Sequence, residues 1–157
     1  RTVVVFQVLD GVEVAIFSLI VTEFGVQCAA PNRCCTHISL VDSVRYARPS
    51  WASSIINRRV LTAYLDDAKR RGFSSAHIWV CPPLKHTSYI FNGRPQTQVV
   101  LSQEVLENWY TQKVMQMSKD DGVVTKITTA SEQYLRTGDP RRIPYLEKDY
   151  LRQILDE

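Results

Sequence analysis

Long uncharged apolar runs are missing from this sequence. The longest apolar stretch, residues 12–21, is interrupted by Glu13 and Ser18. It is therefore about half as long as the ~20 residues that a membrane-spanning helix needs. The succession of charged, apolar and small residues that marks a signal peptide does not follow Arg1 either. We expect no transmembrane helix, no signal peptide and no membrane partner.

Cysteine is scarce, and its spacing does not indicate a disulfide framework. The four cysteines are Cys28, Cys34, Cys35 and Cys81. No CxxC pair is present, and a chain of 157 residues can bury a core without disulfides. A zinc site that adds His37 is a minor alternative, because adjacent cysteines rarely close a tetrahedral site. We expect reduced thiols and no metal.

A strong excess of one charge is also missing, since the net charge is only +3. Basic residues do gather between residues 42 and 66, where no acidic residue separates Arg45, Arg48, Arg58 and Arg59. Such a segment favours an anion, although a solvated basic face is the more common fate of scattered arginines. Aromatic stacking platforms and a recognition helix are not apparent, so we expect no direct contact with nucleic acid.

The first third of the chain has the pattern of a β-hairpin followed by a third strand. β-branched residues run over 3–8, Asp10-Gly11 is a strong hairpin turn, and a second strand is expected over 12–24. A loop over 25–35 precedes a strand that begins near His37 and ends near residues 42–43.

A helix and a further strand complete a crossover. Apolar residues recur at helical spacing from Ser54 to the glycine stop at Gly72, and a strand is expected over 75–81. The right-handed crossover places the two strand ends, Asp42 and Cys81, at one edge of the sheet. The prolines after Cys81 must turn the chain out of the sheet, at the kind of edge where α/β proteins bind ligands.

The second half is expected to be mainly helical. One helix is predicted from Ser102 as N-cap through Met117, with Trp109 and Tyr110 about 100° apart, so that one faces the core and the other the rim. A short strand over 123–127, a helix around Glu132, a loop over 138–140 and a final helix after residue 149 follow. The expected fold is a single α/β domain with a central mixed sheet wrapped by helices.

Several motifs occur together and in order: LVDSV (40–44), RP (48–49), HIWVCPP (77–83), YIF (89–91), ENWY (107–110) and IPYLEKDY (143–150). In this order they resemble the CREB-binding-protein family of histone acetyltransferases, over nearly the whole chain. The family domain extends beyond both ends of this sequence, so the resemblance implies a partial or shortened version of the catalytic domain.

The resemblance implies an acetyl-CoA-dependent lysine N-acetyltransferase with an acetyltransferase-like fold. Histone tails or other lysine-rich proteins would be its substrates, the nucleus its location, and transcription or chromatin proteins its partners through flanking regions. The cofactor would lie along the edge formed by the DSV strand end, the WxCPP turn and the WY helix. Carried over from the family, the residues that contact or flank the cofactor would be Val41, Asp42, Ser43, Cys81, Pro82, Tyr89, Val100 and Trp109.

Two further residues would carry the chemistry that the resemblance implies. Trp79 would wall the lysine tunnel, where an apolar aromatic surface disfavours the ammonium form of an amine whose ordinary pKa is near 10.4. Tyr110 would be the general acid, because a neutral phenol can protonate the departing thiolate. Taken alone, each aromatic has a simpler explanation: core packing for Trp79 and Trp109, and a surface position for Tyr110.

Cys81 stands near His77 and His86, which suggests a nucleophile or a metal ligand. We favour neither role, because the resembled family transfers the acetyl group directly and no third metal ligand is evident.

The sequence departs from the family where arginines grip the cofactor phosphates. Ser53-Ser54 stands in place of Arg-Thr, and Val105 in place of another arginine. Serine hydroxyls at a helix N-terminus can still bind phosphate, and the replacement charge could come from Arg58, Arg59 or Arg94, the last of which stands where the family has histidine. The alternative function is a catalytically weakened relative that acts as a scaffold or an acyl-CoA-binding module.

Overall fold

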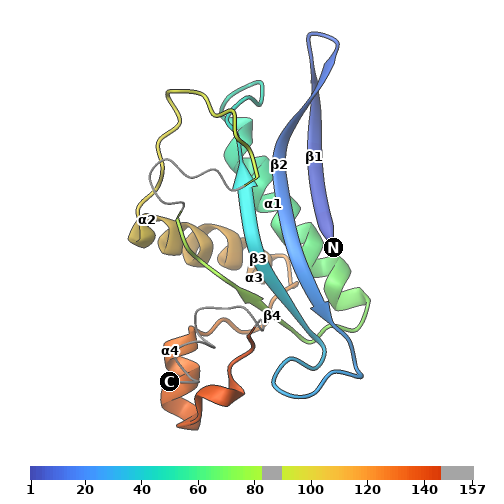
Figure 1. Cartoon of the computed structure of the whole chain (residues 1–157), viewed down its shortest axis with the longest axis vertical. Helices are drawn as coiled ribbons and strands as arrows, with labels where there is room; N and C mark the ends of the chain where they lie inside the picture. Colours follow the sequence, from blue (N-terminus) through green and yellow to red (C-terminus); the bar gives the residue numbers. More distant parts are fainter. Residues whose placement is uncertain (83–89, 146–157) are drawn as a thin grey trace.

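The computed structural model describes residues 1–82 and 90–145. Its elements follow the chain in the order shown in Figure 1: β1 (Thr2–Leu9), β2 (Val12–Phe24), β3 (Cys35–Ser43), α1 (Ala52–Arg70), β4 (Ser75–Ile78), α2 (Gln103–Asn108), the π-helical segment η1 (Trp109–Met115), α3 (Gln116–Asp120), α4 (Ala130–Thr137) and the 3-10 turn η2 (Pro140–Arg142).

The sheet is four-stranded and mixed, with the order β1-β2-β3-β4. The first three strands are antiparallel, and β4 is parallel to β3. Asp10 and Gly11 both have positive φ, 51° and 81°, which matches the backbone of a tight hairpin turn. The hairpin, the third strand and the β3-α1-β4 crossover predicted from the sequence are therefore confirmed.

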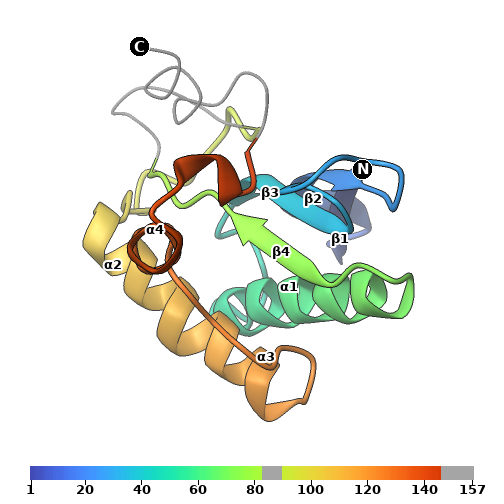
Figure 2. The ribbon, with the colours of Figure 1, turned by 90° about the horizontal axis from the view of Figure 1, so that it is seen from below.

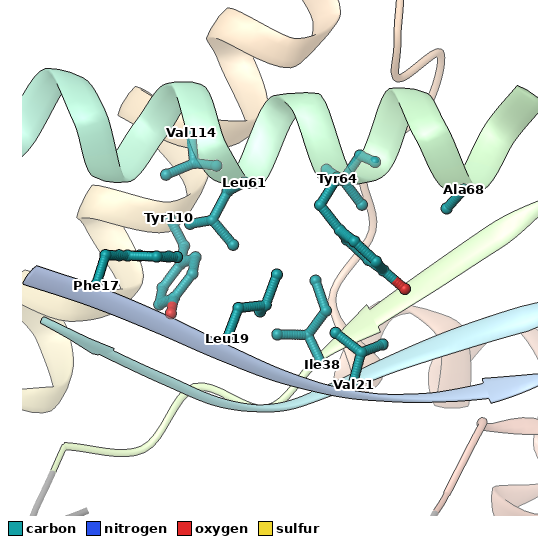
Figure 3. Close-up of a cluster of buried hydrophobic side chains, with 10 residues drawn as sticks. Phe17, Leu19, Val21, Ile38, Leu61, Tyr64, Ala68, Tyr110 and Val114 are labelled. Atoms are coloured by element: carbon teal, nitrogen blue, oxygen red, sulfur yellow. The ribbon is translucent and has the colours of Figure 1, made fainter. Parts of the chain in front are cut away.

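Helix α1 and the continuous helix made by α2, η1 and α3 lie on one face of the sheet (Figure 2). Alternate residues of β2 face these helices, and they meet a buried stripe of α1. Figure 3 shows this core, which is formed by Phe17, Leu19, Val21, Ile38, Leu61, Tyr64, Leu65, Ala68, Tyr110 and Val114. The α/β class with a central mixed sheet is confirmed. No described helix has both the length and the apolar character that crossing a bilayer requires.

Strand β4 is shorter than predicted, because it ends at Ile78 rather than at Cys81. One more ladder bond follows, from the Trp79 amide to the Ile38 carbonyl at 3.0 Å. The Val80 carbonyl then accepts a hydrogen bond of 2.9 Å from the side chain of Gln103 instead of from a strand. The chain thus leaves the sheet before the prolines, and α2 takes over the role of hydrogen-bonding partner.

The strand predicted over residues 123–127 is wrong. The amides of Val123 and Val124 both donate to the Ser118 carbonyl, at 2.9 and 3.0 Å, and so cap the end of α3. Their side chains pack against the core. A β-branched pair therefore serves as a helix stop, since the orphan carbonyls at the end of a helix need donors.

The helix around Glu132 is confirmed as α4. It begins with a capping box between Thr129 and Glu132, and it ends at Gly138, whose φ of 63° is left-handed. The helix predicted after residue 149 lies outside the described residues.

Candidate active site

A cavity of about 280 Å³ opens at the carboxyl end of β3. Its walls come from β3, from the segment after β4, from residues 94–101 and from the helix that carries η1. The lining residues are Ser39, Leu40, Val41, Asp42, Ser43, Trp79, Cys81, Pro82, Arg94, Gln98, Val99, Val100, Leu101, Leu106 and Tyr110. Parallel strands end at the same edge of a sheet, so the crossover brings residues from distant parts of the sequence together here.

The structure gathers most of the predicted site residues around this cavity and leaves others outside its lining. Those that line it are Val41, Asp42, Ser43, Trp79, Cys81, Pro82, Arg94, Val100 and Tyr110. Those that do not are Ser53, Ser54, Arg58 and Trp109. Tyr89 lies outside the described residues, as does His86. The two residues predicted to carry the chemistry, Trp79 and Tyr110, thus share one cavity.

Tyr110 belongs both to the core and to the cavity wall. It is only 7% exposed and lies in the same cluster as Leu61 and Val114. The simpler explanation of Tyr110 as a surface aromatic is therefore wrong. Trp109 is half-buried beside it, with the two rings edge to face at 5.0 Å between centroids. One of these two adjacent aromatics was expected to face the core and the other the rim. The structure places Tyr110 in the core.

Trp79 is held at the cavity by the ladder bond that its amide makes to Ile38. It is half-buried, and its neighbour in the wall, Cys81, is exposed, with its thiol 3.5 Å from the Pro82 carbonyl. Cys28, Cys34 and Cys35 form no disulfide among the described residues.

The carboxylate of Asp42 is buried at the cavity wall and receives donors on both oxygens. Oδ1 accepts from the Ser43 amide at 2.8 Å and from Arg94 Nη2 at 2.6 Å. Oδ2 accepts from the amides of Ile90 and Phe91, at 2.9 and 3.1 Å. The residue is 5% exposed, so its charge is balanced by protein groups rather than by water.

Ser43, the last residue of β3, receives a second group of bonds. Its carbonyl accepts from Arg94 Nη1 at 3.2 Å and from Gln98 Nε2 at 2.9 Å. The side chain of Gln98 also accepts from the Arg45 amide at 2.9 Å, and Asn57 Nδ2 donates to Ser43 Oγ at 3.1 Å. Asn57 thereby joins the first turns of α1 to the rim of the cavity.

Ser53, Ser54 and Arg58 lie on those first turns of α1. The first turn contains no acidic residue, so the positive end of the helix dipole is not neutralised there. Arg58 Nε donates to the Ser54 carbonyl at 3.2 Å. The hydroxyl of Ser53 is buried and has no hydrogen-bond partner among the described residues.

Two arginines of the basic segment form ion pairs with acidic side chains. Arg48 pairs with Asp10 at 2.8 Å, and Arg59 pairs with Asp121 at 2.7 Å. Arg59 is therefore engaged by α3's end rather than directed at the cavity.

The sequence patterns did not identify several residues that line the cavity: Ser39, Leu40, Gln98, Val99, Leu101 and Leu106. Leu106 could have been found, because it lies four residues before Tyr110 and therefore on the same face of the predicted helix. Gln98, Val99 and Leu101 lie in the described segment 90–101, which forms neither helix nor strand and gives no periodic signal.

Comparison with known proteins gives the chain's family. A family model described as "Histone acetyltransferase domain KAT3" matches residues 1–157. Histone acetyltransferase HAC1 of Arabidopsis thaliana is 36% identical over 163 residues, which cover 96% of this chain and 10% of that protein. Histone acetyltransferase HAC12 of the same plant is 35% identical, with the same coverage. Protein cbp-1 of Caenorhabditis elegans is 34% identical over all of this chain and 8% of its own length. The chain thus spans about a tenth of the length of these relatives.

Proposed function

We propose that this chain, which belongs to the KAT3 family of histone acetyltransferase domains, transfers the acetyl group of acetyl-CoA to lysine side chains. Histone tails or other lysine-rich proteins are the proposed substrates. The observation that carries the proposal is that Trp79 and Tyr110 line one cavity at the carboxyl end of β3. Relatives named as histone acetyltransferases support action on histones, and we further propose a nuclear location with transcription or chromatin partners bound through flanking regions.

The cavity suits the narrow acyl arm of the cosubstrate. Its lining includes the aliphatic residues Leu40, Val41 and 99–101, and β3 also contributes the polar residues Ser39 and Ser43. A volume of about 280 Å³ lies just below the ~300 Å³ at which drug-sized ligand pockets begin. The arm can therefore enter, while the nucleotide has to remain outside the cavity.

The exposed nucleotide is proposed to extend toward the start of α1. Asn57 connects that end of the helix to Ser43 on the cavity rim. Ser54 and Arg58 offer a hydroxyl and a guanidinium, donors that suit phosphate, and the buried Ser53 hydroxyl beside them has no partner among the described residues. Trp109 is proposed to flank the cosubstrate from beside Tyr110.

Trp79 is proposed to prepare the lysine for attack. Its indole presents an apolar surface, and desolvation disfavours the ammonium form of the entering side chain. The neutral amine can then form the new carbon–nitrogen bond with the thioester carbonyl carbon as the carbon–sulfur bond breaks.

Tyr110 is proposed to supply the proton that the leaving sulfur takes up. Its phenol is fixed by the core, so the hydroxyl is presented without much freedom of movement, which is the condition for efficient proton transfer. The proton that the acetylated nitrogen loses goes to solvent, and solvent returns a proton to the phenolate of Tyr110, so the overall transfer balances. Cys81 is not assigned a covalent role, since direct transfer needs no acetylated thiol.

Calorimetric titration of acetyl-CoA tests the proposal. The wild type is expected to bind, and Val100→Asp to weaken binding at least tenfold, because the charge would enter the aliphatic part of the lining. Val100 is 48% exposed, so the protein should tolerate the change. Val26→Asp is the matched control, since Val26 is 67% exposed and lies outside the cavity lining.

Transfer to a histone-tail peptide, followed by mass spectrometry, completes this test. An absence of binding at millimolar acetyl-CoA would contradict the proposal. Binding without transfer would favour the alternative, a weakened relative that holds acyl-CoA. Equal binding by wild type and Val100→Asp would show that acetyl-CoA binds outside this cavity.

A further inference from the structure

We propose that Arg94 is a positioning residue of the acetyl-transfer site, because its ion pair with Asp42 fastens the segment 90–101 to the end of β3. The segment 90–101 is here called the wall segment. The inference rests on the proposed function for its effect on catalysis, although the fastening itself can be tested without any substrate.

Arg94 contacts the end of β3 through two of its guanidinium nitrogens. Nη2 lies 2.6 Å from Asp42 Oδ1, and Nη1 donates to the Ser43 carbonyl at 3.2 Å. The arginine side chain is 21% exposed and the aspartate side chain 4%. Charge-assisted bonds in such a sheltered position are stronger and more directional than bonds on an open surface.

The wall segment depends on these side-chain bonds for its position. It forms no helix or strand, so no backbone ladder holds it. Asp42 binds one end of it through the amides of Ile90 and Phe91, Arg94 binds the middle, and Gln98 binds Ser43 further along. All of these bonds converge on the last two residues of β3.

The same segment provides five of the fifteen residues that line the cavity. Arg94, Gln98, Val99, Val100 and Leu101 are all lining residues. Releasing Arg94 would leave Asp42 as a buried charge without its cation, which is strongly unfavourable. The wall would then lose the fixed geometry that binding of the acyl arm requires.

The ion pair with Asp42 argues against a role for Arg94 as a phosphate ligand. Its charge is already neutralised by Asp42 at 2.6 Å, so a phosphate would have to compete with a buried carboxylate for the same guanidinium. A positioning residue should matter equally for acyl donors with and without phosphate, whereas a phosphate ligand should matter only for those that carry it.

Steady-state transfer with two donors, acetyl-CoA and acetyl-pantetheine, distinguishes these roles. For Arg94→Ala we expect KM to rise about tenfold or more for both donors, by a similar factor, with a smaller change in kcat. Arg94→Lys should recover part of the loss, because it restores the cation but not both bonds. Arg136→Ala on α4, where the arginine is exposed, is the matched control. A loss confined to acetyl-CoA would overturn the proposal.

Hydrogen exchange supplies the readout that needs no donor. In the wild type the Ile90 and Phe91 amides should be protected, and Arg94→Ala should accelerate their exchange while the amides of the β1–β2 ladder keep their rates. Unchanged exchange at both residues would also overturn the proposal. If the wild type bound neither donor, the proposed function would fail, and the exchange rates alone would decide the role of Arg94.

Discussion

Replacing Tyr110 by phenylalanine should separate the structural role of this residue from its chemical role. The ring is 7% exposed and belongs to the core, so phenylalanine keeps the buried surface. The substitution removes only the hydroxyl, whose hydrogen bonding contributes about 0.5–1.5 kcal/mol to stability. Tyr110→Ala would also empty the site of the ring and should cost about 3–5 kcal/mol.

The effect of Tyr110→Phe on the reaction should be much larger. A positioned general acid contributes about 10²- to 10⁴-fold to a rate, which corresponds to roughly 3–5 kcal/mol in the barrier. We therefore expect kcat to fall by that factor while KM for acetyl-CoA stays close to the wild-type value. Chemical denaturation gives the stability, and single-turnover transfer to a histone-tail peptide gives the rate.

Tyr134→Phe is the matched control for Tyr110→Phe, because Tyr134 is 47% exposed on α4 and outside the cavity lining. It should change neither the rate nor the stability. A Tyr110→Phe variant that retained kcat within a factor of about three would refute the role of general acid, since even weak acid catalysis exceeds that. An equal loss of stability in Tyr110→Phe and Tyr110→Ala would refute the packing argument.

Three further predictions follow from buried and exposed groups. Leu61→Ala should destabilise the fold by about 2–5 kcal/mol in denaturant, since Leu61 is fully buried, while the exposed Leu135→Ala should change it by less than about 0.5 kcal/mol. Cys81→Ser should retain most transfer activity, and a loss of activity with a trapped acetyl-enzyme in the wild type would contradict direct transfer. Burial, aided by the hydrogen bond to Glu23, raises the pKa of Tyr64 to about 12. The neutral phenol should therefore stabilise the fold fully below the ordinary tyrosine pKa of 10, and this stabilisation should be lost as the pH rises through about 12. Phenolate absorbance compared with Tyr64→Phe measures this titration, and a pKa near 10 would contradict it.

The parts of the fold that the sequence predicted are those set by local signals. The Asp10-Gly11 turn and the spacing of apolar residues in α1 each need only a short window of sequence. The crossover rule then brings β3 and β4 together without any knowledge of side-chain contacts. The location of the cavity could be predicted for the same reason, because the crossover rule fixes where β3 and β4 end.

The parts that the sequence did not predict depend on contacts between distant residues. Arg94 was one of three arginines considered as replacement phosphate ligands, and its contact with Asp42, across 52 positions of sequence in a segment without periodicity, was not foreseen. Likewise, Val123 and Val124 have the composition of a strand, but the nearby end of α3 recruits their amides. Neither outcome could be read from local pattern, because each depends on which unpaired group happens to lie nearby.

The π-helical segment explains how one helix can serve both the core and the cavity. The inward residues Leu106, Tyr110, Val114 and Ser118 are four positions apart, and in a regular α-helix each step of four rotates by about 40° around the axis. Three such steps would turn Ser118 about 120° away from Leu106. In η1 the bonding from each residue to the fifth one before it places more residues in each turn, which reduces this drift. Ser118 can therefore bond Thr62 of α1 at 2.8 Å while Tyr110, on the same face, reaches the cavity. The irregular segment thus helps to keep Val114 and Ser118 on the same face as Tyr110, the tyrosine proposed to deliver the proton.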